Sequence, residues 1–373
     1  MSFRGVASSR ALARLTAVLI AVTLVGSLAA VAAGGGHRTR VRATGKLTAA
    51  PVAHPTTTLP PTTEAPTTEP PTTVADPATS GPPADALAAQ TPQFTLPAVV
   101  PGAPLPAPGA FTLDPYAGLG TWLDVYDWSE TYGGGAVGLA DIDRIASLGV
   151  QTVYVQATRW DAATPVLEPD RLVALINRAR ADGMRVVAWY LPDLGDPNDD
   201  FQRLIAIARL PIDGLAVDIE SRKVPDVNDR NQRLLALSAE LRQQLPGQVL
   251  SAIVLPPVVM EDVNPNYWPD YPWAGLAPYY DVWQPMSYWT NRIGGWRDAY
   301  TYTATNIDRV RDHIGNPNAI VHPIGGIGDT STPDDIAGMT RAAVERGCIG
   351  GSVYDYRTTG DDLWAPLQGL RSG

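Results

Sequence analysis

From about Gly109 onward, short runs of apolar residues alternate with segments whose apolar residues recur at helical spacing. Continuous apolar runs are typical of parallel strands that are covered on both faces, because neither face then meets water. The runs predict eight strands, over 120–126, 150–157, 185–191, 214–219, 249–255, 281–288, 319–325 and 351–356.

Amphipathic segments separate the predicted strands. The segments 139–149 and 169–183 carry apolar residues at helical spacing and end in glycine, which often terminates helices. The segments 231–245 and 306–314 are also amphipathic, and Pro333 followed by two aspartates favours a helix start. Eight strand–helix units in about 260 residues predict a (β/α)8 TIM barrel, an α/β fold. A doubly wound open sheet is the alternative, but no G-x-G-x-x-G motif follows the first strand.

The N-terminal segment 1–36 has the pattern of an export signal or a membrane anchor. Arg4, Arg10 and Arg14 precede or border an uncharged apolar run over 15–33, whose last residues are small. The run is also just long enough to span a bilayer as a helix. A cleaved signal peptide and a retained anchor both stay open. We expect an exported protein, either secreted to the cell wall or anchored in the membrane and facing outward.

The segment 37–108 is predicted to be a disordered linker. Its part 51–108 contains 16 prolines and 12 threonines among 58 residues, and it has no lysine or arginine. Such a composition cannot bury a core, and repeated proline favours an extended polyproline II chain. The linker is interpreted as a simple tether or as an O-glycosylated stalk. The barrel domain is therefore assigned to 109–373.

Charge and cysteine content exclude several functions. Residues 109–373 carry 21 Lys and Arg against 34 Asp and Glu, a net charge of −13, which argues against a nucleic acid partner. Cys348 is the only cysteine in the sequence, so neither an intramolecular disulfide nor a cysteine-based zinc site can form. The four histidines lie at no metal-ligand spacing. We expect neither a metal nor a cofactor.

The fourth predicted strand carries the most informative polar residues, Asp218 and Glu220. Residues two positions apart on a strand share a face, so both carboxyls point the same way and the residues beside them point toward the helices. Active sites of (β/α)8 barrels lie where the strands end. A protonated Glu220 beside an ionised Asp218 would suit general-acid cleavage of a glycosidic bond. The alternative is a structural pair that caps helices or binds nearby basic residues.

The stretch 213–220, D-G-L-A-V-D-I-E, resembles the D-G-x-D-x-D-x-E signature of glycoside hydrolase family 18, the chitinase-like barrels. The resemblance implies that Glu220 is the catalytic acid. It also implies that Asp218 orients the acetamido group of the substrate and stabilises an oxazolinium intermediate. Ala216 stands where the signature has its inner Asp, so Asp218 lacks the partner carboxyl of that pattern.

A second motif lies at the end of the sixth predicted strand. Gln284-Pro285-Met286-Ser287-Tyr288 resembles the M-x-Y element of the same family. The resemblance implies that Tyr288 hydrogen-bonds the acetamido oxygen and that Met286 lines the floor of the pocket. Alternation along a strand places Gln284, Met286 and Tyr288 on one face. The alternative interpretation of the motif is a packed strand.

Aromatic and polar residues near other strand ends complete the predicted site. Ten Trp and fourteen Tyr accompany only four Phe, and many of them fall where a strand ends or in the loop that follows. Their apolar faces and polar edges suit stacking on sugar rings, although they could also serve only to pack the barrel and its loops. The predicted substrate-binding residues are Trp122, Asp124, Tyr126, Gln156, Trp189, Gln284, Met286, Trp289, Asp355 and Tyr356.

Three functions are compatible with these features. The leading hypothesis is an exported or membrane-tethered glycoside hydrolase-like protein that acts on an N-acetylated glycan of the peptidoglycan or chitin type. In substrate-assisted cleavage the N-acetyl oxygen of the sugar is the nucleophile, so no second protein carboxylate need attack. Two departures from the family pattern favour a catalytically inactive carbohydrate-binding barrel instead. They are Ala216 and the lack of the tryptophan that the resemblance implies at the end of the eighth strand. The third hypothesis is a hydrolase of another sugar that uses a second carboxylate, from Asp124, Asp193 or Asp355.

Overall fold

The part of the chain that the structure describes is the predicted barrel domain with a few linker residues. The computed structural model describes residues 92, 94 and 104–371, so the predicted export segment and most of the predicted linker lie outside it. None of the helices in this described part is both long and apolar enough to cross a membrane. The linker already contacts the domain at Phe94, whose ring packs edge-on against Phe201 at 5.4 Å.

The strands form a closed parallel barrel. In the sheet order β5-β4-β3-β2-β1-β9-β8-β6-β7, a further pairing of β5 with β6 closes the ring, and every pairing is parallel. The short strands β7 and β8 both pair with β6, so together they take the place of the seventh of eight barrel strands. The predicted (β/α)8 barrel is therefore confirmed. The strands are β1 (Gly118–Leu123), β2 (Thr152–Gln156), β3 (Arg185–Tyr190), β4 (Gly214–Ile219), β5 (Leu250–Val254), β6 (Val282–Ser287), β7 (Ile320–Val321), β8 (Ile324–Gly325) and β9 (Gly350–Val353).

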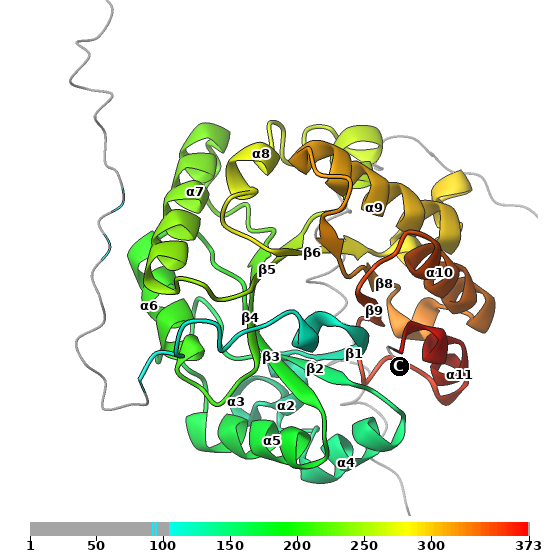
Figure 1. The fold of residues 1–373 in the computed structure, drawn as a ribbon, viewed down its shortest axis with the longest axis horizontal. Helices are drawn as coiled ribbons and strands as arrows, with labels where there is room; N and C mark the ends of the chain where they lie inside the picture. Colours follow the sequence, from blue (N-terminus) through cyan, green and yellow to red (C-terminus); the bar gives the residue numbers. More distant parts are fainter. Residues whose placement is uncertain (1–91, 93, 95–103, 372–373) are drawn as a thin grey trace, which may run out of the picture. The chain divides into compact units, whose positions relative to one another are not determined.

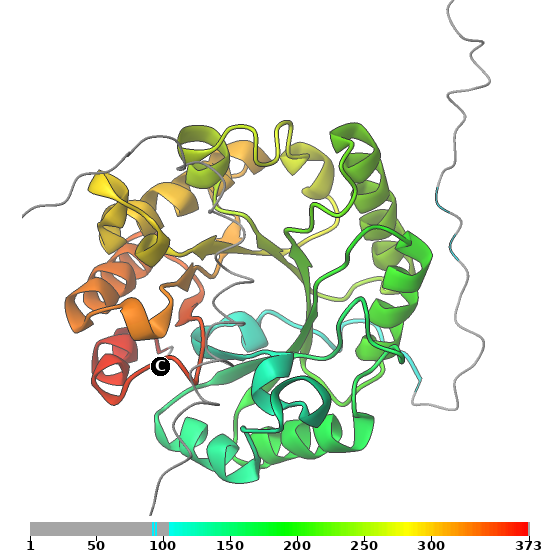
Figure 2. The same ribbon diagram turned by 180° about the vertical axis from the view of Figure 1, so that it is seen from behind.

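Helices surround the barrel on its outer side, as Figures 1 and 2 show from opposite ends. Most of the long helices begin with an aspartate or threonine whose side chain accepts a backbone N–H of the first turn, as at Asp196, Asp226, Asp298 and Thr332. The long helices are α4 (Leu139–Ser147), α5 (Pro169–Ala181), α6 (Pro197–Ala208), α7 (Val227–Gln244), α9 (Ala299–Ile314) and α10 (Pro333–Glu345).

Short helical turns fill the connections. Four of them are α-helical: α2 (Val125–Trp128), α3 (Glu130–Gly133), α8 (Trp273–Leu276) and α11 (Trp364–Leu367). The others are 3-10 turns, apart from the π-helical turn η3: η2 (Asp114–Tyr116), η3 (Val259–Val263), η4 (Trp289–Asn291), η5 (Gly294–Arg297), η6 (Gly328–Thr330), η7 (Asp361–Leu363) and η8 (Gln368–Leu370).

Three predicted strands differ from the observed ones beyond a shift of one or two residues at their ends: the first, the seventh and the eighth, which ends at Val353 instead of residue 356. The first strand ends at Leu123 instead of residue 126, because the Asp124 side chain accepts the N–H groups of Tyr126 and Asp127 and so begins α2. The seventh strand is interrupted around Pro323, which has no N–H to donate to a neighbouring strand. The first difference places Asp124 at a helix start, on the edge of the barrel where the strands end.

The interior of the barrel is filled by aromatic and polar side chains. Trp122 stacks on Tyr154 at 4.3 Å, and Tyr154 contacts the His322 ring at 5.3 Å. The Trp122 indole donates to the Ser352 hydroxyl (2.8 Å), which is 3.0 Å from His322 Nε2. Because Nδ1 of His322 donates to the Tyr116 carbonyl at 2.8 Å, Nε2 is left to accept from Ser352. His322 is therefore neutral, and burial lowers its pKa to about 4.

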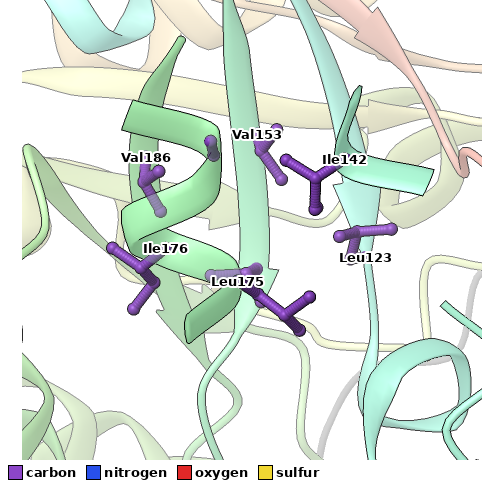
Figure 3. Close-up of a pocket in the computed structure, with 8 residues that line it drawn as sticks. Leu123, Ile142, Val153, Leu175, Ile176 and Val186 are labelled. Atoms are coloured by element: carbon purple, nitrogen blue, oxygen red, sulfur yellow. The ribbon is translucent and has the colours of Figure 1, made fainter. Parts of the chain in front are cut away.

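A second, purely apolar layer lies between the strands and the helices. Figure 3 shows a cavity there, between β1–β3 and the helices α4 and α5. Its lining holds no polar side chain, so the cavity offers nothing that could orient a sugar. It is lined by Leu123, Ile142, Val153, Val155, Leu175, Ile176, Ala179 and Val186.

Candidate active site

The two carboxylates predicted on the fourth strand lie at the carboxyl end of β4 and face the barrel interior. Asp218 is 5% exposed and Glu220 is half-buried. The charges of both raise the pKa of Tyr288, which directly follows β6. β4 and β6 both pair with β5, so this interaction spans the strand between them. The shared orientation expected from strand alternation is therefore present.

Burial governs the ionisation of this pair. Loss of contact with water raises the pKa of Glu220 to about 7. Burial also raises the pKa of Asp218 well above its usual value, and the charge of Glu220 raises it further. Below neutral pH the pair therefore carries at most one negative charge. A carboxylic acid that keeps its proton near pH 7 is suited to protonate a leaving group.

Two tyrosines, Tyr288 and Tyr271, lie near the pair, and a third, Tyr354, packs beside Tyr288. Burial raises the pKa of Tyr288 well above its usual value, and the Tyr288 ring lies 6.0 Å from that of Tyr354. Tyr271 donates a long hydrogen bond (3.4 Å) to the carbonyl of Ile219, within β4. Burial raises the pKa of the Tyr271 phenol, and the charges of Asp218 and Glu220 contribute. All three phenols are thus neutral donors at physiological pH.

Several polar atoms around the pair have no hydrogen-bond partner in the described structure. They are Asp218 Oδ1, Trp189 Nε1 and Gln284 Nε2, each inaccessible to water. The oxygen of the Gln284 amide does have a partner, because it accepts a hydrogen bond from the Ser251 hydroxyl at 2.6 Å. Buried polar atoms usually find partners, so these atoms are exceptions to the usual pairing.

Three further carboxylates cluster beside these tyrosines. One oxygen each from Asp124, Asp127 and Asp355 lies within 4.8 Å of the others. Burial raises the pKa of all three, that of Asp355 to about 7 with a contribution from the charge of Asp124. Tyr354 donates to Asp124 at 2.7 Å, and Thr358 N donates to Asp355 at 2.9 Å. Asp124 and Asp355 are thus hydrogen-bonded to their neighbours, and one oxygen from each of the three aspartates is close enough to the others to approach a single cation.

The predicted aromatic residues are not all brought together. Trp122 and Trp189 lie inside the barrel with rings 5.9 Å apart, and Met286 is 6% exposed. Trp289, Trp122 and Gln284 are all fully buried, so none of the three has a surface to offer a ligand. Tyr356 donates to Asp141 of α4 at 3.4 Å.

Gln156 is the last residue of β2, and Tyr126 lies within α2. The Gln156 side chain accepts the N–H of Val125 at 3.1 Å, which connects β2 to the start of α2. Tyr126 is half-buried and accepts a hydrogen bond from Arg159, whose guanidinium lies 5.4 Å from the Tyr126 ring. Both residues therefore lie near the strand ends, but neither has a contact with the carboxylate pair.

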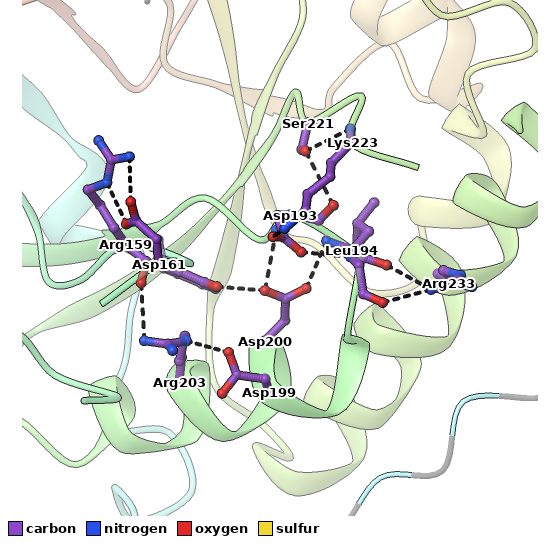
Figure 4. Close-up of polar contacts among 12 residues, drawn as sticks. Arg159, Asp161, Asp193, Leu194, Asp199, Asp200, Arg203, Ser221, Lys223 and Arg233 are labelled. Atoms are coloured by element: carbon purple, nitrogen blue, oxygen red, sulfur yellow. Dashed lines mark hydrogen bonds and ion pairs between the residues drawn. The ribbon is translucent and has the colours of Figure 1, made fainter. Parts of the chain in front are cut away.

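The loop after Glu220 is held by a polar network shown in Figure 4. Ser221 donates to the carbonyl of Asp193 at 3.3 Å, and Lys223 forms an ion pair with the Asp193 carboxylate. Asp200 accepts from the Tyr190 phenol at 2.6 Å and from Leu194 N at 2.9 Å. The Asp193 carboxylate is thus engaged in loop contacts. It is a weaker candidate for a second catalytic acid than its position after a strand suggests.

Sequence reasoning did not single out Tyr267, Tyr271, Arg222 or Arg230 as site residues. Tyr267 and Tyr271 come from the aromatic, proline-rich stretch 266–280. The composition of this stretch is the feature of the sequence that could have identified them as site residues. Their approach to β4 depends on the path of the loop that follows β5, which no local pattern specifies.

The fold and the site together define a (β/α)8 barrel with a buried carboxylate pair at the end of β4. No family model and no curated protein matches the sequence. Among solved structures, the Bacillus cereus spore cortex-lytic enzyme SleL is similar with a TM-score of 0.52 and 10% identity, over 69% of this chain and 74% of that one. A class V chitinase from Pseudomonas fluorescens Pf-5 is similar with a TM-score of 0.51 and 11% identity, over 68% of this chain and 100% of that one. At these identities the likeness shows the barrel fold that the chitinase-like resemblance implied.

Proposed function

We propose that the protein is an exported or membrane-tethered glycoside hydrolase that cleaves an N-acetylated glycan of the chitin or peptidoglycan type. The observation that carries the proposal is the pair at the end of β4. Glu220 has a pKa of about 7, and the neighbouring Asp218 has a buried oxygen without a partner. The barrel fold shared with a chitinase and a spore cortex-lytic enzyme supports the choice of a glycan.

In the proposed reaction the Glu220 carboxylic acid transfers its proton to the glycosidic oxygen as the bond to the anomeric carbon breaks. The N-acetyl oxygen of the sugar attacks that carbon and forms an oxazolinium ion. Asp218 Oδ1, unpaired in the structure, would accept the N–H of the acetamido group, and the Tyr288 phenol would donate to its oxygen. Water then attacks the anomeric carbon while Glu220, now a carboxylate, takes a proton from it.

The test compares the full chain with its Glu220→Gln variant on purified chitin oligomers and on peptidoglycan. The wild type should release reducing ends, and the variant should lose about 10²- to 10⁴-fold in rate, the usual contribution of a general acid. Glu240→Gln makes the same chemical change on the outer helix α7 and should leave the rate unchanged. An unchanged rate for Glu220→Gln would remove Glu220 from the mechanism.

The second candidate is a carbohydrate-binding barrel without catalytic activity. Ala216 favours it, because this fully buried residue stands two positions before Asp218 and offers no carboxyl to share a proton with it. Calorimetric binding of the same oligomers without any reducing ends from the wild type would support this candidate. Released reducing ends that depend on Glu220 would exclude it.

A further inference from the structure

Two arginines lie on aromatic rings close to Glu220. Arg222 follows Glu220 by two residues, and its guanidinium lies 4.5 Å from the centre of the Tyr267 ring. Arg230, in the first turns of α7, lies 4.2 Å from the centre of the Trp268 ring. Helices begin near the ends of the preceding strands, so both arginines belong to the edge of the barrel that carries the site.

The aromatic rings that these arginines lie on, those of Tyr267 and Trp268, are held firmly in place. The Trp268 indole donates to Asn231 of α7 at 2.8 Å, and the Asn231 amide donates to the Asp270 carbonyl at 2.8 Å. Trp268 is 1% exposed and Tyr267 is 2% exposed. The rings therefore hold the two guanidinium groups in place without neutralising their charge.

The charge of Arg230 is buried without a partner. Arg230 is 3% exposed, its Nε makes no hydrogen bond, and no carboxylate of the described chain forms an ion pair with Arg230 or with Arg222. Asp226, the nearest acid in sequence, is engaged in capping α7 through Asp229 N at 2.8 Å. Burial lowers the pKa of Arg230 and the charge of Arg222 lowers it further, while Tyr267 and Asp226 act in the opposite direction without forming an ion pair with it. A buried charge is costly unless an opposite charge meets it.

The unpaired charge lies beside the catalytic candidate. The phenol of Tyr267 is buried, and its pKa is raised by burial and by the charge of Glu220 and lowered by the charge of Arg222. Tyr267 thus lies within electrostatic range of both groups.

We propose that Arg222 and Arg230 form a subsite for a carboxylate group on the glycan, next to the bond that is cleaved. This inference rests on the proposed function and names its substrate class: an N-acetylated glycan with acidic sugar units. Guanidinium groups bind carboxylates through paired, charge-assisted hydrogen bonds. Two carboxylate sources fit, the lactyl ether of an N-acetylmuramic acid unit and the ring carboxylate of a hexuronic acid unit.

The test measures binding, so that it does not depend on turnover. Calorimetry on full-length Glu220→Gln protein would use three probes: an N-acetylglucosamine oligomer, a peptidoglycan glycan oligomer with N-acetylmuramic acid, and a hyaluronan oligomer. Adding Arg222→Gln should weaken binding of at least one acidic oligomer by about ten- to hundredfold, the range for charge-assisted bonds. Binding of the neutral oligomer should change less than about twofold. The acidic oligomer that loses affinity identifies the carboxylate source.

Two controls separate this effect from a general loss of charge or of folding. Arg341→Gln removes an equivalent charge from the outer helix α10 and should leave binding of every oligomer unchanged. Added salt should weaken binding of the acidic oligomer more for the parent protein than for the Arg222→Gln protein, because salt screens the exposed Arg222 charge. Equal losses for neutral and acidic oligomers, or no loss for any, would overturn the subsite. Neither result bears on whether Glu220 is catalytic.

Discussion

The carboxyls of Asp218 and Glu220 project from one face of β4, and the charge of Glu220 raises the pKa of Asp218. The coupling is reciprocal, so ionisation of Asp218 must also hinder ionisation of Glu220. Both groups also lose most of their contact with water. This combination keeps a proton on the pair at neutral pH, the property on which the proposed acid catalysis depends.

The first prediction concerns the pH dependence of hydrolysis. The general acid must be protonated, and the pKa of Glu220 is about 7, so kcat/KM should fall about tenfold per pH unit above pH 7. Removing the neighbouring charge in Asp218→Asn should move this alkaline limb to lower pH. The measurement is the rate of reducing-end release between pH 5 and 9, with Glu240→Gln as a control whose limb stays in place. A rate that does not change across this range would show that Glu220 is not the acid.

The second prediction concerns the pH dependence of stability. Glu220, Asp200 and Asp355 each have a pKa of about 7 in the folded chain, against usual values of 4.5 for Glu and 3.8 for Asp. Between these limits the folded state binds more protons than the unfolded state, so the stabilising contribution is full at about pH 4 and is lost as the pH rises through 7. The free energy of unfolding in urea should therefore fall between pH 5 and 8, by on the order of a few kcal/mol.

Single variants separate the groups that cause this slope. Glu220→Gln removes one titrating group and should make the decline between pH 5 and 8 shallower. Asp298→Asn should leave the slope in that range unchanged, because hydrogen bonds from Thr301 lower the pKa of Asp298 and keep it ionised there. A slope that is the same in wild type and Glu220→Gln would mean that Glu220 ionises normally.

The third prediction concerns the bond from Tyr354 to Asp124. Tyr354→Phe removes the 2.7 Å donor to a carboxyl whose pKa burial already raises, so the Asp124 pKa should rise further. The free energy of unfolding at pH 7 should fall by about 1–3 kcal/mol, the range for a buried acceptor that loses a partner. Tyr300→Phe removes a phenol bonded to Glu345 on the outer helices and should cost less. Equal losses in the two variants would count against a special role for the Asp124 bond.

The parts of the fold that follow from local pattern could be predicted from the sequence. The predicted fourth strand, 214–219, has the bounds of β4, because an apolar run that is buried on both sides leaves little freedom for its ends. The orientation of Asp218 and Glu220 follows from strand geometry alone. The predicted helix start at Pro333 is also confirmed, with Thr332 and Asp335 forming a capping box.

The parts that depend on distant contacts could not be predicted. Asp124 was expected to end a strand, but its bonds to two following N–H groups turn the chain into α2. Trp289 was expected to contact the substrate and is fully buried. No sequence motif marks Arg230 as a site residue, because the ring that it lies on comes from a loop about forty residues later in the chain. In each case the outcome depends on which segments meet in space.

The last prediction concerns the hydroxyl of Ser352 inside the barrel, which links the Trp122 indole to His322. Ser352→Ala leaves Nε1 of Trp122 and Nε2 of His322 buried without partners, so the free energy of unfolding should fall by about 2–4 kcal/mol. Ser287→Ala is the matched control, because Ser287 is equally buried on β6 but its hydroxyl has no partner to lose. It should be nearly neutral in urea unfolding at pH 7. Because the two variants delete the same atom from equally buried positions, the difference between them measures the hydrogen bonds and not the cavity. Equal losses would show that the link from Trp122 to His322 contributes nothing to stability.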